Sequence, residues 1–167
     1  MLRFVLFAAA AASLLPASAA LADTPAVSRV EVVIGPDLAA KADKLGQREF
    51  DYLARDLKRA VERRLERAGG LTASGGRLRL VIDDAVPNRP TPLQLTSKPG
   101  LSMESFGNGG ARVSGEYVSA DGVSTPIRYR WYETDVWQAQ YAATWSDASL
   151  AFDRLARRIE DGQFVKD

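Results

Sequence analysis

The sequence predicts an α+β protein in which an antiparallel sheet of four or more strands carries two amphipathic helices on one face. Three observations predict this fold class. Several short segments alternate apolar and polar residues, which is typical of half-buried strands. Two longer segments repeat apolar residues at three- and four-residue steps, which is typical of helices that lie on a core. An Asp-Gly pair between two of the alternating segments predicts a hairpin.

The first 22 residues have the organisation of a secretory signal peptide. Arg3 supplies the positive charge, an apolar run covers residues 4–15, and small residues precede the expected cleavage after Ala22. Cleavage after Ala19 is the competing choice. An uncleaved membrane anchor is the alternative, but the apolar run is shorter than the ~20 residues that a span requires. We therefore expect a periplasmic or secreted location in a bacterium.

Composition and charge argue against several classes of function. The remaining chain, residues 23–167, has the length of a single domain, and no later segment is expected to span a membrane. It keeps 21 basic and 21 acidic residues, so it lacks the basic excess of a nucleic-acid binder. It has no Cys and no His, which removes thiol nucleophiles, disulfides, Ser-His-Asp triads and the usual zinc ligands. We expect no cofactor, no metal site and no catalytic residue.

A strand, a helix and a second strand are expected in the first half of the chain. Residues 29–35 alternate and end at a Gly-Pro pair, which predicts a strand. The segment 37–46 is compatible with a helical turn or a loop. Residues 47–68 follow the helical period and end before two glycines. Residues 77–86 alternate again, so the order strand, helix, strand suggests a split βαβ unit.

Five glycines lie between Phe106 and Gly122 and raise the question of a phosphate-binding loop. Neither spacing that marks such loops is present, and these glycines lead into a strand rather than a helix. They are therefore interpreted as turn or bulge residues at the entry to a sheet. Residues 111–118 and 123–133 alternate, and Asp121–Gly122 between them predicts the hairpin.

The C-terminal part predicts the second helix. Residues 144–162 have a helical apolar face, with Thr144 or Ser146 as the N-cap and Asp147 in the first turn. The preceding segment, 135–143, is left open between an extension of the helix and an extension of the sheet.

The connection at residues 87–110 is the candidate binding surface. It holds four prolines and four glycines, and a type II turn is expected at Pro99–Gly100. Residues 93–95 and 101–103 alternate and are compatible with short strands. It also holds five large apolar side chains, which are expected either to contact a partner or to close the core. Two aromatic residues outside the expected core join them as candidates. The candidate partner-binding residues are Leu93, Leu95, Leu101, Met103, Phe106, Tyr132 and Trp137.

Four segments carry a resemblance to a known group of proteins. "RPTPLQL", "PGLS", "GNGGARVSGEYVSADG" and "TWSDASLAFDRLARRI" resemble bacterial envelope proteins of unknown function, many of them predicted lipoproteins, over residues 78–160. The resemblance implies a strand of small residues, a hairpin and a final amphipathic helix that packs on the sheet. It implies no catalytic residue. The lipid-modified cysteine of that group is missing from this chain.

These observations favour a non-catalytic periplasmic or envelope module for binding or assembly. Its expected partner is an envelope protein rather than a nucleic acid. After signal cleavage the protein is expected to have no stable membrane span. The sequence does not predict its oligomeric state. The alternative is a carboxylate-dependent enzyme that acts on an envelope glycan. That alternative rests on Asp83 and Asp84 at a strand end, beside a long connection that could close over them.

Overall fold

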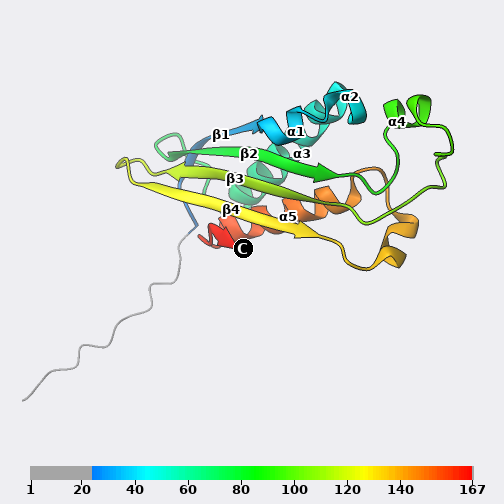
Figure 1. Ribbon diagram of the computed structural model, residues 1–167. Helices are drawn as coiled ribbons and strands as arrows, with labels where there is room; N and C mark the ends of the chain where they lie inside the picture. Colours follow the sequence, from blue (N-terminus) through cyan, green and yellow to red (C-terminus); the bar gives the residue numbers. More distant parts are fainter. Residues whose placement is uncertain (1–23, 167) are drawn as a thin grey trace, which may run out of the picture.

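The computed structural model describes residues 24–166, which form one mixed sheet with helices behind it (Figure 1). The predicted signal peptide therefore lies outside the described residues. The α+β class is confirmed, and the strand order follows the chain from β1 to β5. The strands are β1 (Val27–Ile34), β2 (Gly76–Val86), β3 (Gly110–Val118), β4 (Ser124–Tyr132) and the short β5 (Val165–Lys166).

The sheet is not purely antiparallel, which corrects the prediction. β1 and β2 pair in parallel, with Val30 opposite Leu78 and Val32 opposite Leu80. They are joined by the 21-residue helix α3 (Gln47–Arg67), which returns the chain along the sheet so that β2 starts at the same edge as β1. Because β1 and β2 are direct neighbours, the βαβ unit is not split. β2, β3 and β4 are antiparallel to one another, whereas β5 is parallel to β4.

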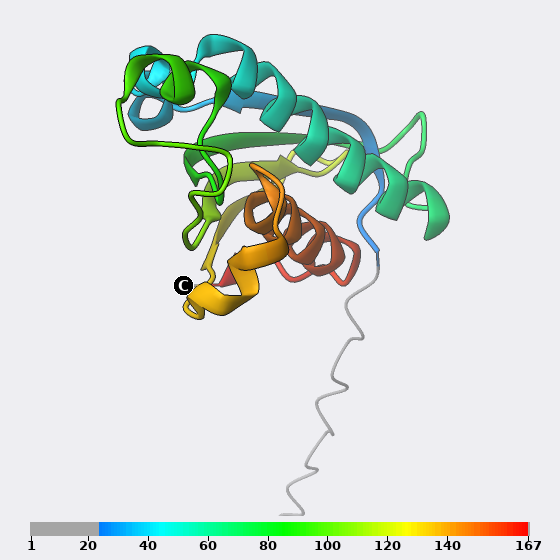
Figure 2. The same ribbon diagram turned by 90° about the vertical axis from the view of Figure 1, so that its right-hand side faces the viewer.

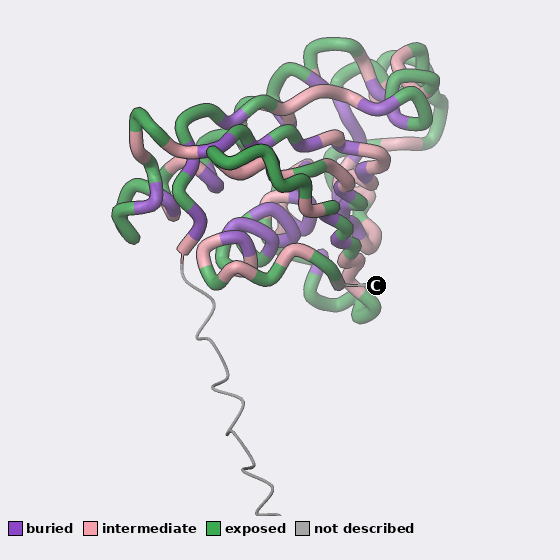
Figure 3. Tube along the Cα trace, turned by 90° about the vertical axis from the view of Figure 1, so that its left-hand side faces the viewer, coloured by how far each residue is buried: buried purple, intermediate pink, exposed green. Residues whose placement is uncertain are grey.

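Two long helices lie side by side on one face of the sheet, as Figures 1 and 2 show. They are α3 and α5 (Ser146–Glu160). Each helix buries the residues that recur at three- and four-residue steps, so burial of these stripes against the strands holds the layers together. The buried residues, purple in Figure 3, include Phe50, Leu53, Leu57, Val61 and Leu65 of α3, Phe152, Leu155 and Ile159 of α5, and Leu78, Leu80, Ile82, Val113, Ile127 and Tyr129 of the strands.

Polar side chains join the two helices along the edges of their contact. The indole nitrogen of Trp145 donates a hydrogen bond to Glu49 at 2.6 Å. At the other end, Arg64 and Glu160 form an ion pair with an N–O distance of 3.3 Å. These contacts fix how far one helix can slide along the other.

The two segments for which the sequence was compatible with more than one structure form short helices. Residues 36–45 form α1 (Pro36–Ala39) and α2 (Ala42–Leu45), which bury Leu38 and Leu45. Residues 135–143 contain the 3₁₀ helix η1 (Val136–Tyr141), so they extend neither the sheet nor α5.

The start of α5 also differs from the prediction. The N-cap residue is Trp145 rather than Thr144 or Ser146, and its side chain makes no capping bond. The hydroxyl of Ser146 instead accepts from the backbone nitrogen of Ala143. The first turn is stabilised by the contacts of Asp147, as described below.

The predicted hairpin is present between β3 and β4. The backbone nitrogen of Gly122 donates to the carbonyl oxygen of Ser119 at 3.0 Å, and Ser119 in turn donates to Val123 at 2.9 Å. Gly122 has a φ of 87°, in the left-handed region that disfavours a Cβ atom. A side chain there would meet no atom within 4 Å, so only the backbone conformation requires glycine.

Replacing Gly122 by alanine should therefore destabilise the protein by about 1 kcal/mol, because alanine resists the left-handed conformation. Thermal unfolding should show a fall in Tm of about 3 °C. Gly107 offers a matched control, since a methyl group there also meets no atom within 4 Å and its φ is not positive. Equal Tm values for the two alanine variants would contradict this account of the turn.

Candidate functional site

The long connection between β2 and β3 is a folded segment with its own helix. Leu93 and Leu95 belong to α4 (Pro92–Ser97), so the short strand considered for residues 93–95 is wrong. Thr91 and Gln94 form a reciprocal capping box at its N-terminus, which explains why the helix starts there. The second alternating pair, residues 101–103, is not in a strand either.

The expected turn at Pro99–Gly100 is present. Gly100 has a φ of 88°, and the backbone nitrogen of Leu101 lies 3.4 Å from the carbonyl oxygen of Lys98. A proline followed by a glycine with positive φ is the pattern of a type II turn. The connection is thus composed of a capped helix, a tight turn and a returning loop.

A buried polar cluster ties both ends of this connection to the start of α5. The side-chain amide of Asn88 donates to the carboxylate of Asp147 at 2.5 Å and to the carbonyl oxygen of Gly107 at 3.1 Å. The same carboxylate accepts from the backbone nitrogen of Gly109 at 2.9 Å. The backbone nitrogen of Asp147 completes the cluster by donating to Asn88 at 2.9 Å. Asn88 and Asp147 are both buried.

Arg89 holds the returning loop against η1. Its guanidinium donates to the carbonyl oxygens of Met103 and Ala142, both at 2.7 Å, and also to that of Gln140. The charged group lies 5.8 Å from the ring centre of Phe106, a cation–π arrangement. Because one side chain bonds to both segments, the loop around Met103 and the helix η1 lie next to each other at the same end of the sheet.

The large apolar side chains of this connection do not close the core. None of the five is buried: Leu95 and Leu101 are half-buried, and Leu93, Met103 and Phe106 are 37%, 59% and 40% exposed. On η1, Val136, Trp137 and Tyr141 are 42%, 72% and 90% exposed. Arg89 joins these two segments at one end of the sheet, and we call their exposed apolar residues the apolar end surface: Met103, Phe106, Val136, Trp137 and Tyr141.

A shallow groove adjoins the apolar end surface. Its volume is about 260 Å³, and Leu101 and Phe106 line it together with Pro87 and Pro90. Leu93 lies elsewhere, on the side of α4 that faces α2, where its Cβ is within 4 Å of the position a side chain on Gly46 would take. Of the predicted binding residues, Met103, Phe106 and Trp137 thus lie exposed on the two segments that Arg89 joins, and Leu101 lines the groove.

Tyr132 is not part of this surface. It lies half-buried on the opposite face of the sheet from the long helices, and its hydroxyl donates to Asp84 at 2.7 Å. Burial raises the pKa of the Tyr132 hydroxyl, and the hydrogen bond to the Asp84 carboxylate raises it further. The phenol is thus a fixed partner of Asp84 rather than a free exposed aromatic group.

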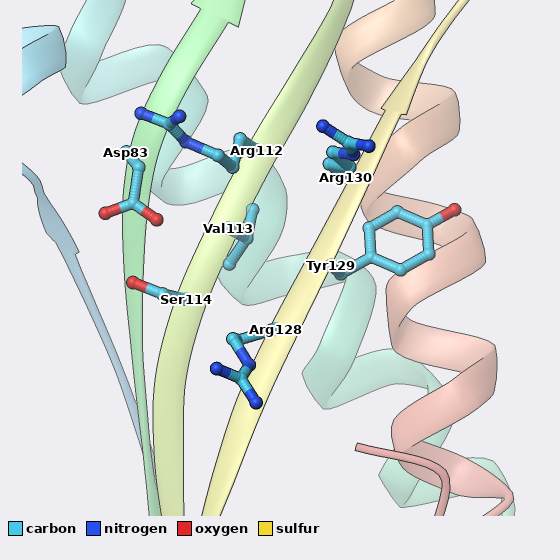
Figure 4. Close-up of a pocket in the computed structure, with 7 residues that line it drawn as sticks. All are labelled: Asp83, Arg112, Val113, Ser114, Arg128, Tyr129 and Arg130. Carbon is cyan, nitrogen blue, oxygen red and sulfur yellow. The ribbon is translucent and has the colours of Figure 1, made fainter. Parts of the chain in front are cut away.

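The two consecutive carboxylates have different surroundings. Asp84 sits where the register between β2 and β3 shifts, and it accepts from Lys41 at 2.5 Å as well as from Tyr132. Burial acts to raise the pKa of Asp84, but the hydrogen bonds from Lys41 and Tyr132 outweigh it and hold the pKa below its ordinary value. Asp83 instead lines a groove on the open face of the sheet (Figure 4). The lowered pKa of Asp84 is the opposite of the raised pKa that a catalytic acid needs.

Sequence reasoning did not find Arg89, Asn88 or Asp147 as the residues that organise the site. Asp147 was assigned only to the first turn of a helix, and Asn88 and Arg89 stood in a segment without periodicity. The available signal was the position of Asn88 and Arg89 between two prolines, where a polar pair inside a rigid stretch often makes fixed contacts. Tyr141, the most exposed aromatic residue of the surface, was missed because η1 has no clear period.

Comparison with known proteins does not assign the chain to a family. No protein-family model and no curated protein matches it. The resemblance to envelope proteins therefore stays a prediction. Within residues 24–166, no helix is both long and apolar enough to span a membrane, and no three acidic side chains are grouped so that they could hold a metal ion.

Proposed function

We propose that the protein is a non-catalytic binding module of the bacterial cell envelope, and that it binds an apolar segment of a protein partner through the apolar end surface. One observation carries this proposal: a connection whose backbone is fixed by buried hydrogen bonds leaves its large apolar side chains exposed. Clustered exposed apolar groups in soluble proteins often mark interaction sites. The envelope location rests on the predicted signal peptide at residues 1–22.

The way the surface is held supports binding. Arg89 uses its donors on backbone carbonyls of both segments, so the apolar side chains project from a fixed frame. A binding loop that is already ordered loses little conformational entropy when a partner arrives. Trp137 and Tyr141 are also the residue types that most often dominate interface energies, together with arginine.

The surroundings of Asp84 favour this proposal over an enzyme that acts on a glycan. A glycosidase of the common type needs one carboxyl group with a raised pKa as the acid and a second carboxylate close to it. The pKa of Asp84 is lowered, and both of its oxygens accept hydrogen bonds from Lys41 and Tyr132. Asp84 is thus suited to hold α1 and α2 against the sheet rather than to transfer a proton.

Photocrosslinking in cells tests the proposal. A photoreactive amino acid at position 137 should capture a defined protein partner, and the double variant Met103→Ser/Tyr141→Ser should reduce that capture at least tenfold. The expected loss follows because removing two exposed apolar contacts of an interface costs about 1 kcal/mol or more each. Both side chains are largely exposed, so the variant should keep the Tm of the unchanged protein to within about 2 °C.

Val123 provides the control. It is 59% exposed, as Met103 is, but it lies in the β3–β4 hairpin. Val123→Ser should leave capture unchanged, and a photoreactive residue at position 123 should not capture the same partner. Equal capture from positions 123 and 137, or equal loss in both serine variants, would refute a specific role for the apolar end surface.

A further inference from the structure

The face of the sheet that α3 and α5 leave open is rich in arginine. No described element covers this face, which is turned toward the viewer in Figure 1. Four acidic residues, Glu31, Asp83, Asp84 and Glu116, accompany six arginines on the open side of β1 to β4. These arginines are Arg29, Arg77, Arg79, Arg112, Arg128 and Arg130.

The positive charges are balanced at one part of this face and unbalanced at another. Arg79 lies opposite Glu31 on one neighbouring strand and opposite Glu116 on the other. Arg112 has Asp84 opposite it on β2, but on its other side it lies directly opposite Arg130. Like charges at directly opposed positions of a sheet destabilise it, so this pairing calls for another reason.

The unbalanced arginines line a groove. Its volume is about 350 Å³, and its polar lining consists of Asp83, Ser114 and three arginines. Figure 4 shows these side chains on β2, β3 and β4, with Tyr129 turned toward the helices. Within residues 24–165, neither Arg128 nor Arg130 forms an ion pair, and Arg112 pairs only with Asp37, at 3.0 Å on the surface. Three guanidinium groups thus surround one groove that holds a single carboxylate.

We propose that this groove binds a phosphate ester that also carries a hydroxyl group. Guanidinium groups match phosphate oxygens with paired, charge-assisted hydrogen bonds. A phosphate with two negative charges offsets the repulsion between Arg112 and Arg130 better than a single carboxylate does.

Asp83 indicates the second feature of the ligand, which is a hydroxyl group. Its carboxylate has no hydrogen-bond partner among the described residues, and it would repel a bare phosphate. A hydroxyl group next to the phosphate would donate to Asp83, while Ser114 adds a neutral donor from β3. A soluble sugar phosphate offers a phosphate and hydroxyl groups with two negative charges, and the phosphodiester headgroup of phosphatidylglycerol offers them with one. The site is independent of the apolar end surface.

Calorimetric titration of the purified protein tests the site with three probes: glucose 1-phosphate, inorganic phosphate and vesicles of phosphatidylglycerol. Binding of glucose 1-phosphate supports a soluble ligand, and binding of vesicles alone supports a lipid headgroup. Arg128→Gln and Arg130→Gln should each raise the Kd of the bound probe about tenfold, because each removes a charge-assisted contact. Arg130→Lys keeps the charge but loses the paired geometry, so its Kd should lie between those of the unchanged protein and Arg130→Gln.

Arg79→Gln is the matched control, since it makes the same change of charge on the same face outside the groove. It should change the Kd by less than about twofold. Asp83→Asn should tighten the binding of inorganic phosphate about twofold and remove the preference for glucose 1-phosphate over phosphate. Absence of binding to all three probes would overturn the proposal, and so would equal weakening by Arg79→Gln and Arg130→Gln. Neither result would bear on partner capture by position 137.

Discussion

Replacing Asn88 by alanine should lower the free energy of unfolding by about 3–4 kcal/mol. The substitution removes three side-chain hydrogen bonds, two of them to Asp147 and one to Gly107. It leaves the carboxylate and the backbone nitrogen of Asp147 with fewer partners in a buried place, where each unsatisfied group costs about 1–3 kcal/mol. Denaturation in urea measures the change, which should appear as a lower midpoint with an unchanged slope.

The same variant should also weaken partner capture, because the cluster fixes the position of the connection that carries Met103 and Phe106. The neighbouring residue Asn108 supplies the control. The side-chain oxygen of Asn108 is buried but has no hydrogen-bond partner, so Asn108→Ala should cost less than about 1 kcal/mol. If Asn88→Ala and Asn108→Ala unfold at the same urea concentration, the polar cluster does not stabilise the connection as described.

The parts of the fold that sequence patterns predicted are those with strong local periodicity. α3 buries Phe50, Leu53, Leu57, Val61 and Leu65, all of them on the predicted apolar face, because a helical period and its buried stripe are the same property. The hairpin at Gly122 was equally local, since a positive φ restricts the residue type at that one position.

The direction of β1 relative to β2 could not be read from either strand alone. Alternation of apolar and polar residues is the same in parallel and antiparallel pairs, so it does not report strand direction. The information lay in the connection: a strand, a long helix and a neighbouring strand produce a parallel pair. The prediction took this unit as split, with another strand between the two, and therefore expected antiparallel neighbours throughout, whereas only β2, β3 and β4 follow that pattern.

The sequence predicted the apolar side chains of the candidate site, but not the contacts that hold its backbone in place. The apolar residues of the long connection stood out by composition, and the structure leaves Met103 and Phe106 exposed. The contacts that order this connection join residues far apart in the chain, 59 positions for Asn88 and Asp147. No local period records such contacts. The arginine groove was missed for a related reason, because its members alternate on three strands and become neighbours only through the register.

The second large effect is expected for Gly115→Ala in the middle of β3. Gly115 lies opposite Leu80 on β2 and Ile127 on β4, and its φ is 156°, outside the range of ordinary strand residues. A methyl group there would fall on the carbonyl oxygen of Arg79 and within 3.0 Å of the Cα atom of Leu80. Since β3 is held between two strands, neither the backbone of β2 nor that of β3 can yield without losing pairing. We expect a loss of about 3 kcal/mol or more in the free energy of unfolding.

Ser114→Ala is the control for this prediction, because Ser114 directly precedes Gly115 on the same strand and its side chain points to the open face. It should change the free energy of unfolding by less than about 0.5 kcal/mol. Hydrogen exchange separates the two effects further: Gly115→Ala should speed the exchange of backbone amides along β2 and β3, because their pairing is what the methyl group disturbs. Unchanged exchange in β2 together with unchanged stability would show that the two strands are less closely apposed at Gly115 than described.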